Sequence, residues 1–141
     1  MTSVSGDLLD AYRRTEYRVL DGDNPFVMRV DQECAPLRRC HEAFDVRCSS
    51  FITAWNPCST PTPYAVNDAA MERLSHDVVA LGLRALPGIG VDPAGQWPGE
   101  PSLLVLGLDV PAALTLARAY RQHAIICAGS DAVPHLVVAT V

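Results

Sequence analysis

Hydrophobic residues recur at helical spacing between residues 68 and 86, and this pattern predicts the longest helix of the chain. Asn67 is a good N-cap residue, and Asp68 in the first turn would interact favourably with the helix dipole. Because such a stripe is typical of a helix that packs on a core, we interpret it as structural. The stripe consists of Met71, Leu74, Val78, Leu81 and Ala85.

Alternating apolar and polar residues predict two paired strands near the N-terminus, over residues 15–20 and 26–30. Residues 21–25 lie between them and contain Asp-Gly and Asn-Pro pairs, which favour turns. Residues 102–108 are apolar almost throughout, without alternation. That pattern is typical of a strand buried on both faces, so we expect it in the middle of a sheet.

The remaining segments complete the predicted fold. The sequence Asp-Pro-Ala-Gly at residues 92–95 favours a type I turn, which would join a strand at residues 88–91 to the one at residues 102–108. Further strands are predicted at residues 50–55, 124–128 and 136–139, and helices at residues 6–14, at residues 35–44 and after Asp109. The order is β-β-α-β-α-β-β-α-β-β after the first helix, which predicts an α+β fold with helices packed on a single mixed β-sheet.

Length and charge restrict the function. The 141 residues fit one globular domain spanning residues 1–141, with residues 1–11 as a loose N-terminal helix or tail. The net charge of −5 argues against a nucleic-acid partner or an anionic membrane surface. All 11 basic residues are arginines, which excludes reactions that need a lysine amine.

The cysteines and the N-terminal segment favour a cytoplasmic protein. The first 14 residues contain no apolar segment of the kind that a secretory signal needs, and no run is long enough to span a membrane. Five cysteines in such a chain are expected to be free thiols. Cys34, Cys40, His41, Cys48 and Cys58 lack zinc-site spacing, so we expect no metal or cofactor. The four histidines are expected in surface or capping positions.

The first candidate site is the loop that follows the predicted strand at residues 50–55. Asn56 and Ser59 offer hydrogen-bond donors and acceptors, and Trp55 offers a flat apolar wall. Cys58 would be a nucleophile if a nearby helix N-terminus lowered its pKa. The alternative is a connection made rigid by proline, in which Asn56 caps its own backbone.

The second candidate site is the segment at residues 96–101. Glu100 follows Pro98-Gly99 and precedes Pro101, close to Trp97, so its carboxylate has little freedom to move away. It would either pair with an arginine such as Arg73, as a structural salt bridge, or bind the amine of a ligand.

Several of these segments together resemble the bacterial DUF3293 family, whose function is unknown. The resemblance extends over about residues 12–138 and implies one domain with a shared site around Asn56, Asn67, Arg73 and Glu100. The family usually has Gly-Gln before the penultimate strand, where this chain has Arg121-Gln122, and the cysteines are not part of its pattern. The motifs are residues 51–57, Asn67 and Arg73, residues 87–90 and residues 97–102.

The leading hypothesis is therefore a binding or regulatory module whose polar cluster contacts a small molecule or a segment of a protein partner. One alternative is a small hydrolase or transferase that uses Glu100 or a histidine as acid or base. Another is a homodimer that pairs through a sheet edge. All depend on whether the two loops meet in space. The expected ligand-binding residues are Trp55, Asn56, Ser59, Asn67, Arg73, Trp97 and Glu100.

Overall fold

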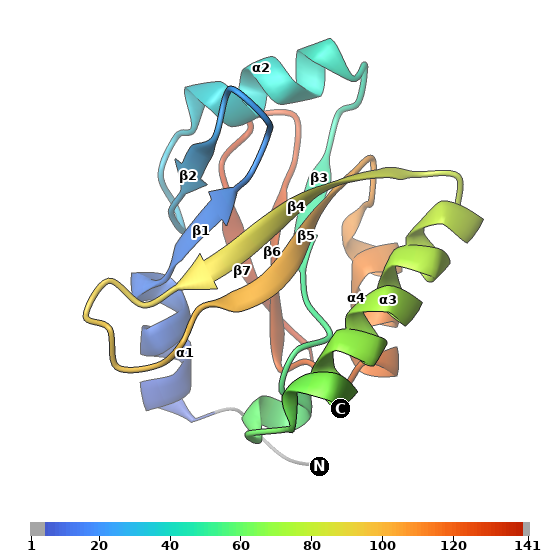
Figure 1. Cartoon of the computed structure of the whole chain (residues 1–141). Helices are drawn as coiled ribbons and strands as arrows, with labels where there is room; N and C mark the ends of the chain where they lie inside the picture. The colour runs from blue at the N-terminus through green and yellow to red at the C-terminus, as the bar shows by residue number, and fades with distance from the viewer. Residues whose placement is uncertain (1–4, 140–141) are drawn as a thin grey trace.

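A computed structural model describes residues 5–139, which fold around one seven-stranded antiparallel sheet (Figure 1). The strand order is β2-β1-β4-β5-β3-β6-β7. The strands are β1 (Glu16–Val19), β2 (Phe26–Met28), β3 (Ser49–Ile52), β4 (Arg84–Val91), β5 (Glu100–Leu106), β6 (Ala124–Ala128) and β7 (His135–Val138). The helices are α1 (Gly6–Arg14), α2 (Ala35–Ala43), the 3-10 helix η1 (Pro57–Ser59), α3 (Tyr64–Ala80) and α4 (Val110–Ala119).

The predicted α+β class and the predicted order of elements are confirmed, and β5 lies at the centre of the sheet as expected. The helix predicted at residues 6–14 is α1, while residues 1–4 of the expected tail lie outside the described residues. The pairings are all antiparallel, where a mixed sheet was expected. The reason is that β3 and β4 run in the same direction but β5 lies between them, and β3 likewise separates β5 from β6.

The segment from β3 to β6 therefore has two helical crossovers that each skip one strand. Its β-α-β-β-α-β order is the ferredoxin-like arrangement. The β1–β2 hairpin extends this sheet beside β4, and β7 extends it beside β6.

The boundaries of α3 differ from the predicted ones. The helix begins at Tyr64, so Asn67 lies inside its first turns and is buried rather than acting as the N-cap. It ends at Ala80, because Gly82 adopts a positive φ of 75° and the chain then turns into β4. The last two positions of the hydrophobic stripe consequently leave the helix face, and Leu81 is 53% exposed.

One face of the sheet is covered by α3 and α4. Their inward side chains pack on alternate residues of the central strands, such as Ile52 of β3 and Val105 of β5. Leu74 and Val78 of α3 and Ala113 and Ala117 of α4 are almost fully buried there. Figure 1 shows both helices on the same side of the sheet.

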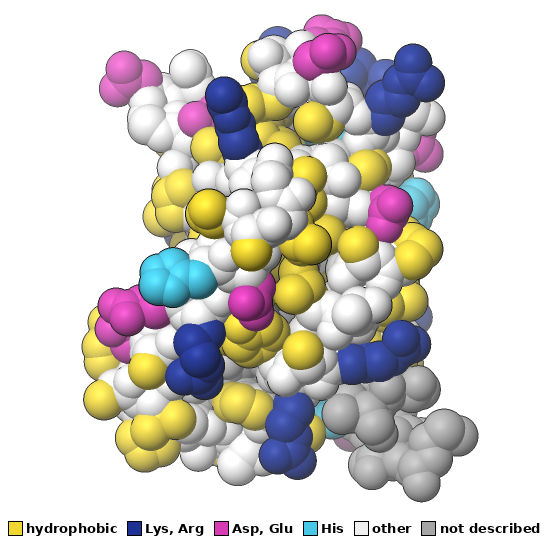
Figure 2. Space-filling view, turned by 90° about the vertical axis from the view of Figure 1, so that its right-hand side faces the viewer, with side chains coloured by type: hydrophobic (Ala, Val, Ile, Leu, Met, Phe, Trp, Pro, Cys, Tyr) yellow, Lys and Arg dark blue, Asp and Glu magenta, His cyan; other side chains and the backbone are white. Residues whose placement is uncertain are grey.

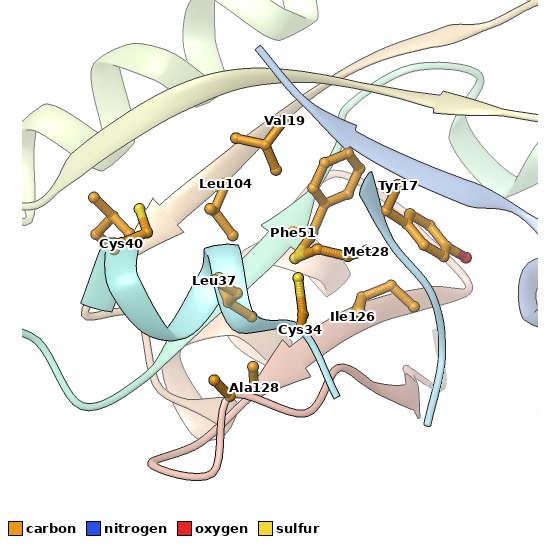
Figure 3. Close-up of a cluster of buried hydrophobic side chains, with 12 residues drawn as sticks. Tyr17, Val19, Met28, Cys34, Leu37, Cys40, Phe51, Leu104, Ile126 and Ala128 are labelled. Atoms are coloured by element: carbon orange, nitrogen blue, oxygen red, sulfur yellow. The ribbon is translucent and has the colours of Figure 1, made fainter. Parts of the chain in front are cut away.

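The opposite face is covered by α2 at one end of the strands (Figure 3). Leu37 of α2 is fully buried against Leu104 and neighbouring side chains of the sheet. Tyr17 and Phe51 meet edge to face with ring centroids 5.3 Å apart. In Figure 3 the Tyr17 hydroxyl points away from α2, toward the end of the face that α2 leaves uncovered.

His41, at the end of α2, does not have the surface or capping role that was expected for it. Its ring is buried and its Nε2 lies 2.7 Å from the Ser49 hydroxyl. Burial lowers the pKa of His41, since the charged form would lose its hydration.

The surface over α3 and α4 carries charges of both signs. Figure 2, which looks at the right-hand side of the view in Figure 1, shows arginine and acidic side chains interspersed with hydrophobic ones. Within residues 5–139, each helix is too short or too polar to cross a membrane.

Candidate functional site

The part of the sheet that α2 leaves uncovered forms the floor of a cavity of about 780 Å³. Its walls come from α1, from the η1 loop between β3 and α3, and from the loop between β4 and β5. Figure 1 shows these three segments at the end of the molecule opposite α2. Volumes of this size are typical of sites that bind small organic molecules.

The structure brings together six of the seven residues expected to bind a ligand, because all six line this cavity. They are Trp55, Asn56, Ser59, Asn67, Trp97 and Glu100. In particular, the two loops converge: the Asn56 side-chain amide donates to Oε1 of Glu100 at 3.3 Å.

Arg73 does not line the cavity, which corrects the expected pairing with Glu100. It lies six residues beyond Asn67 on α3, and at about 100° per residue this places it on a different side of the helix. Its side chain is exposed, and its positive charge interacts with the phenol group of Tyr120. Burial and a hydrogen bond to Asp77 raise the pKa of Tyr120 to about 12, and the positive charge of Arg73 opposes this shift.

Asn56 and Asn67 form a reciprocal pair at the entrance to α3. The Asn56 backbone N–H donates to Oδ1 of Asn67 at 2.9 Å, and Nδ2 of Asn67 donates to Oδ1 of Asn56 at 2.8 Å. Thr62 donates its N–H to Oδ1 of Asn56 and accepts a hydrogen bond from Nδ2 of Asn67. The polar atoms of both amide groups are therefore largely occupied by the protein itself, so these residues position the loop and orient Glu100.

Glu100 has a different environment. Its Oε1 accepts from Asn56, and no described residue bonds its Oε2. Within residues 5–139, every side-chain nitrogen or oxygen that is fully buried has a hydrogen-bond partner. Because Oε2 has none among these residues, it is not fully buried and remains accessible. Burial raises the pKa of the Glu100 carboxyl group, and the hydrogen bond from Asn56 opposes this shift.

The η1 loop is held in an unusual backbone conformation. Asn56, Cys58 and Ser59 have positive φ angles of 47°, 54° and 56°, a region that residues other than glycine rarely adopt. Two contacts hold the loop: Cys58 donates its N–H to the Arg121 carbonyl at 2.7 Å, and Gln122 donates to the Trp55 carbonyl at 3.2 Å. Backbone strain of this kind is concentrated at functional sites in proteins.

Cys58 does not line the cavity, and its thiol has no histidine partner among the described hydrogen bonds. The backbone of this residue, rather than its sulfur, contributes to the loop.

Aromatic rings form much of the remaining wall. Both tryptophans and three of the four tyrosines of the chain line the cavity, together with Phe51. Trp55 and Tyr64 meet edge to face with centroids 5.4 Å apart, although Tyr64 is 72% exposed at the rim.

Helix α1 closes the cavity on its outer side. It presents Leu8, Ala11 and Tyr12 to the cavity, and none of its residues is fully buried. The Tyr17 hydroxyl donates to the Tyr12 carbonyl at 2.6 Å, and the Tyr12 and Ser59 hydroxyls lie 3.4 Å apart. Burial raises the pKa of the Tyr12 phenol, with Ser59 opposing the shift.

Comparison with known proteins identifies the family. The model of the family described as "Protein of unknown function (DUF3293)" matches residues 52–125, which is more than half of the chain. The chain belongs to the DUF3293 family. The matched residues coincide with most of the ferredoxin-like segment and are fewer than residues 12–138, over which the resemblance was expected. No curated protein and no solved structure matches the chain.

The DUF3293 match includes residue 121, where the resemblance described above led us to expect glycine before the glutamine. Arg121 takes the place of that glycine and adopts a positive φ of 57°. The Gln122 N–H bonds the Ala117 carbonyl at 2.8 Å, which closes the end of α4 in the way that glycine normally allows. The helix ending is thus preserved with a residue that fits it less well.

Several lining residues were not expected from the sequence. They include Thr53 directly after β3, Gly90 on β4 and Ser102 on β5, all on the face that α2 and α1 share. The sequence did contain a signal for this part of the site. On this face, β5 changes from polar residues, Glu100 and Ser102, to apolar ones, Leu104 and Leu106. Among the described residues, no group of three or more histidine, cysteine or acidic side chains could hold a metal ion.

Proposed function

We propose that this DUF3293 protein binds a small organic molecule in the cavity beneath α1, and that Glu100 provides the principal polar contact. The observation that supports this most is the convergence of Asn56 and Glu100 at a cavity of about 780 Å³. Asn56 and Asn67 hold the carboxylate in place, while Oε2 remains available for a hydrogen-bond donor of the ligand.

The same geometry favours binding over catalysis. An enzyme that used Glu100 as acid or base would need a second group, such as a histidine or Cys58, within hydrogen-bond reach. Among the described residues that line the cavity there is neither a histidine nor a cysteine. We propose a cytoplasmic location as well, supported by five cysteines that are all free thiols.

A variant that narrows the cavity tests this function. A Cβ atom at position 90 would meet only Thr15 Cγ2, at 3.7 Å, so β4 has room for a side chain at this position of the cavity lining, and Gly90→Val adds two methyl groups to it. Both proteins would be dialysed against a low-molecular-weight cell extract, and the retained compounds identified by mass spectrometry. The proposal predicts a compound that the wild type retains and Gly90→Val does not; equal retention by both, or none by the wild type, would contradict it.

A further inference from the structure

We infer that the molecule bound in this cavity carries a positively charged amino group, which pairs with Glu100 while aromatic rings enclose its apolar body. This inference rests on the proposed function and adds the chemical class of the ligand. It depends on three features of the lining: its charge, its free hydrogen-bonding atoms and its aromatic rings.

The charge of the lining comes from one residue. Among the described residues that line the cavity, Glu100 is the single charged side chain, and no arginine or histidine accompanies it. The chain contains no lysine. A carboxylate or phosphate group of a ligand would therefore meet one negative charge and no positive one, which is unfavourable in a partly dehydrated space.

Several hydroxyl donors of the lining already have partners within the protein. The hydroxyl groups of Thr53 and Ser102 donate to backbone carbonyls, at 2.7 Å and 3.0 Å. The Tyr17 hydroxyl donates to the Tyr12 carbonyl. These donors are occupied within the protein, whereas the acceptor Oε2 of Glu100 is not. The cavity thus offers a carboxylate acceptor to a ligand that donates hydrogen bonds.

The negative charge of the Glu100 carboxylate is also poorly compensated by the protein itself. Its one partner within residues 5–139 is a neutral amide, 3.3 Å away, and burial raises its pKa. An ammonium group would supply the missing positive charge and form a charge-assisted hydrogen bond, which is stronger than a bond between neutral groups. The electron-rich faces of the tryptophan and tyrosine rings also attract cations.

Three probes of the same shape test the charge directly: 2-phenylethylamine, 2-phenylethanol and phenylacetate, each titrated calorimetrically into the full chain near pH 7. We expect the amine to bind about tenfold or more tightly than the alcohol, since a hydrogen bond to a charged group is the stronger one. Phenylacetate should bind most weakly. The Glu100→Gln variant should bind the amine and the alcohol equally.

The control is Glu72→Gln, which removes the same charge from an exposed position on α3 and should keep the preference for the amine. Thermal unfolding checks that both variants are folded. Equal binding of amine and alcohol by the wild type, tighter binding of phenylacetate, or loss of the preference in Glu72→Gln would overturn the inference. Failure of all three probes would overturn it too, while the proposed function would still be judged by the dialysis experiment.

Discussion

The two faces of the sheet are covered in different ways. On one face, the 17-residue α3 and the 10-residue α4 lie across the central strands and bury side chains such as Ile52 and Val105. On the other, α2 and α1 have nine residues each and lie toward opposite ends of the strands. A helix rises 1.5 Å per residue, so nine residues extend only about 14 Å. The space between these short helices is the cavity.

The two faces of this one sheet therefore have different roles, one in stability and the other in binding. The face under α3 and α4 is lined by interlocking aliphatic side chains, and it holds the fold together. The face under α1 is lined by aromatic rings with a few polar or small residues between them, and its loop backbone is strained. Substitutions on the first face should therefore reduce stability, whereas substitutions on the second should change binding.

The largest expected effect is the loss of a side chain under α3. Leu74→Ala removes a fully buried group and should lower the free energy of unfolding by about 2–5 kcal/mol. Leu8→Ala on α1, where the side chain is half-buried beside the cavity, should lower it by less than about 1 kcal/mol. Urea denaturation measures both, and similar losses would mean that the two faces do not differ as described.

Two glycines of β4 locate the border between α2 packing and the cavity. A Cβ atom at Gly88 would lie 2.6 Å from the Phe51 ring and 2.9 Å from the Arg18 carbonyl, so Gly88→Ala should destabilise the protein by about 1–3 kcal/mol. At Gly90 the nearest atom is 3.7 Å away, so Gly90→Ala should be neutral or slightly stabilising. If both variants unfold at the same temperature, the cavity does not begin between these positions.

A smaller effect is expected at the end of α4, where the backbone is strained. Arg121 holds a positive φ of 57°, which disfavours side chains with a Cβ atom by about 1 kcal/mol. Arg121→Gly should accordingly raise the free energy of unfolding by about that amount and leave probe binding unchanged. The matched variant Arg118→Gly, inside α4, should destabilise the protein instead.

The smallest effect concerns the pH dependence of the cavity. The pKa of Glu100 is raised in the folded protein above its ordinary value of 4.5, so the charged carboxylate disfavours folding. This destabilisation is absent well below pH 4.5, grows between pH 4.5 and the folded pKa, and stays constant above it. Glu100→Gln should then melt at a slightly higher temperature than the wild type at pH 7 and at the same temperature near pH 4. A lower melting temperature of the variant at pH 7 would show that Glu100 is a structural residue.

Much of the fold could be predicted from local sequence patterns. The uniformly apolar residues of β5 predicted its central position, and the turn residues after β4 predicted the hairpin. The start of α3 was wrong by four residues because Asn67, which reads as a cap, instead bonds Asn56 across the loop. Such a contact between side chains eleven residues apart leaves no periodic signal.

The residues of the site could be predicted only in part, because contacts between distant segments also determine which side chains line the cavity. Asn56 and Glu100 stood out because prolines and tryptophans surround them, whereas nothing in the sequence around Tyr12 points to a site. Its role follows only from the place of α1 over the sheet. Arg73 was assigned through its charge, and the helical rotation from Asn67 removes it from the cavity.

The most direct test of the account is a titration of the protein with 2-phenylethylamine, followed through backbone amide chemical shifts by NMR. We expect the largest shifts at Asn56, Trp97 and Glu100 and along α1, with Leu74 and Val78 on the opposite face unchanged. Shifts concentrated in α3 and α4, or none at saturating amine, would contradict the claim that the space between α1 and α2 is a binding site.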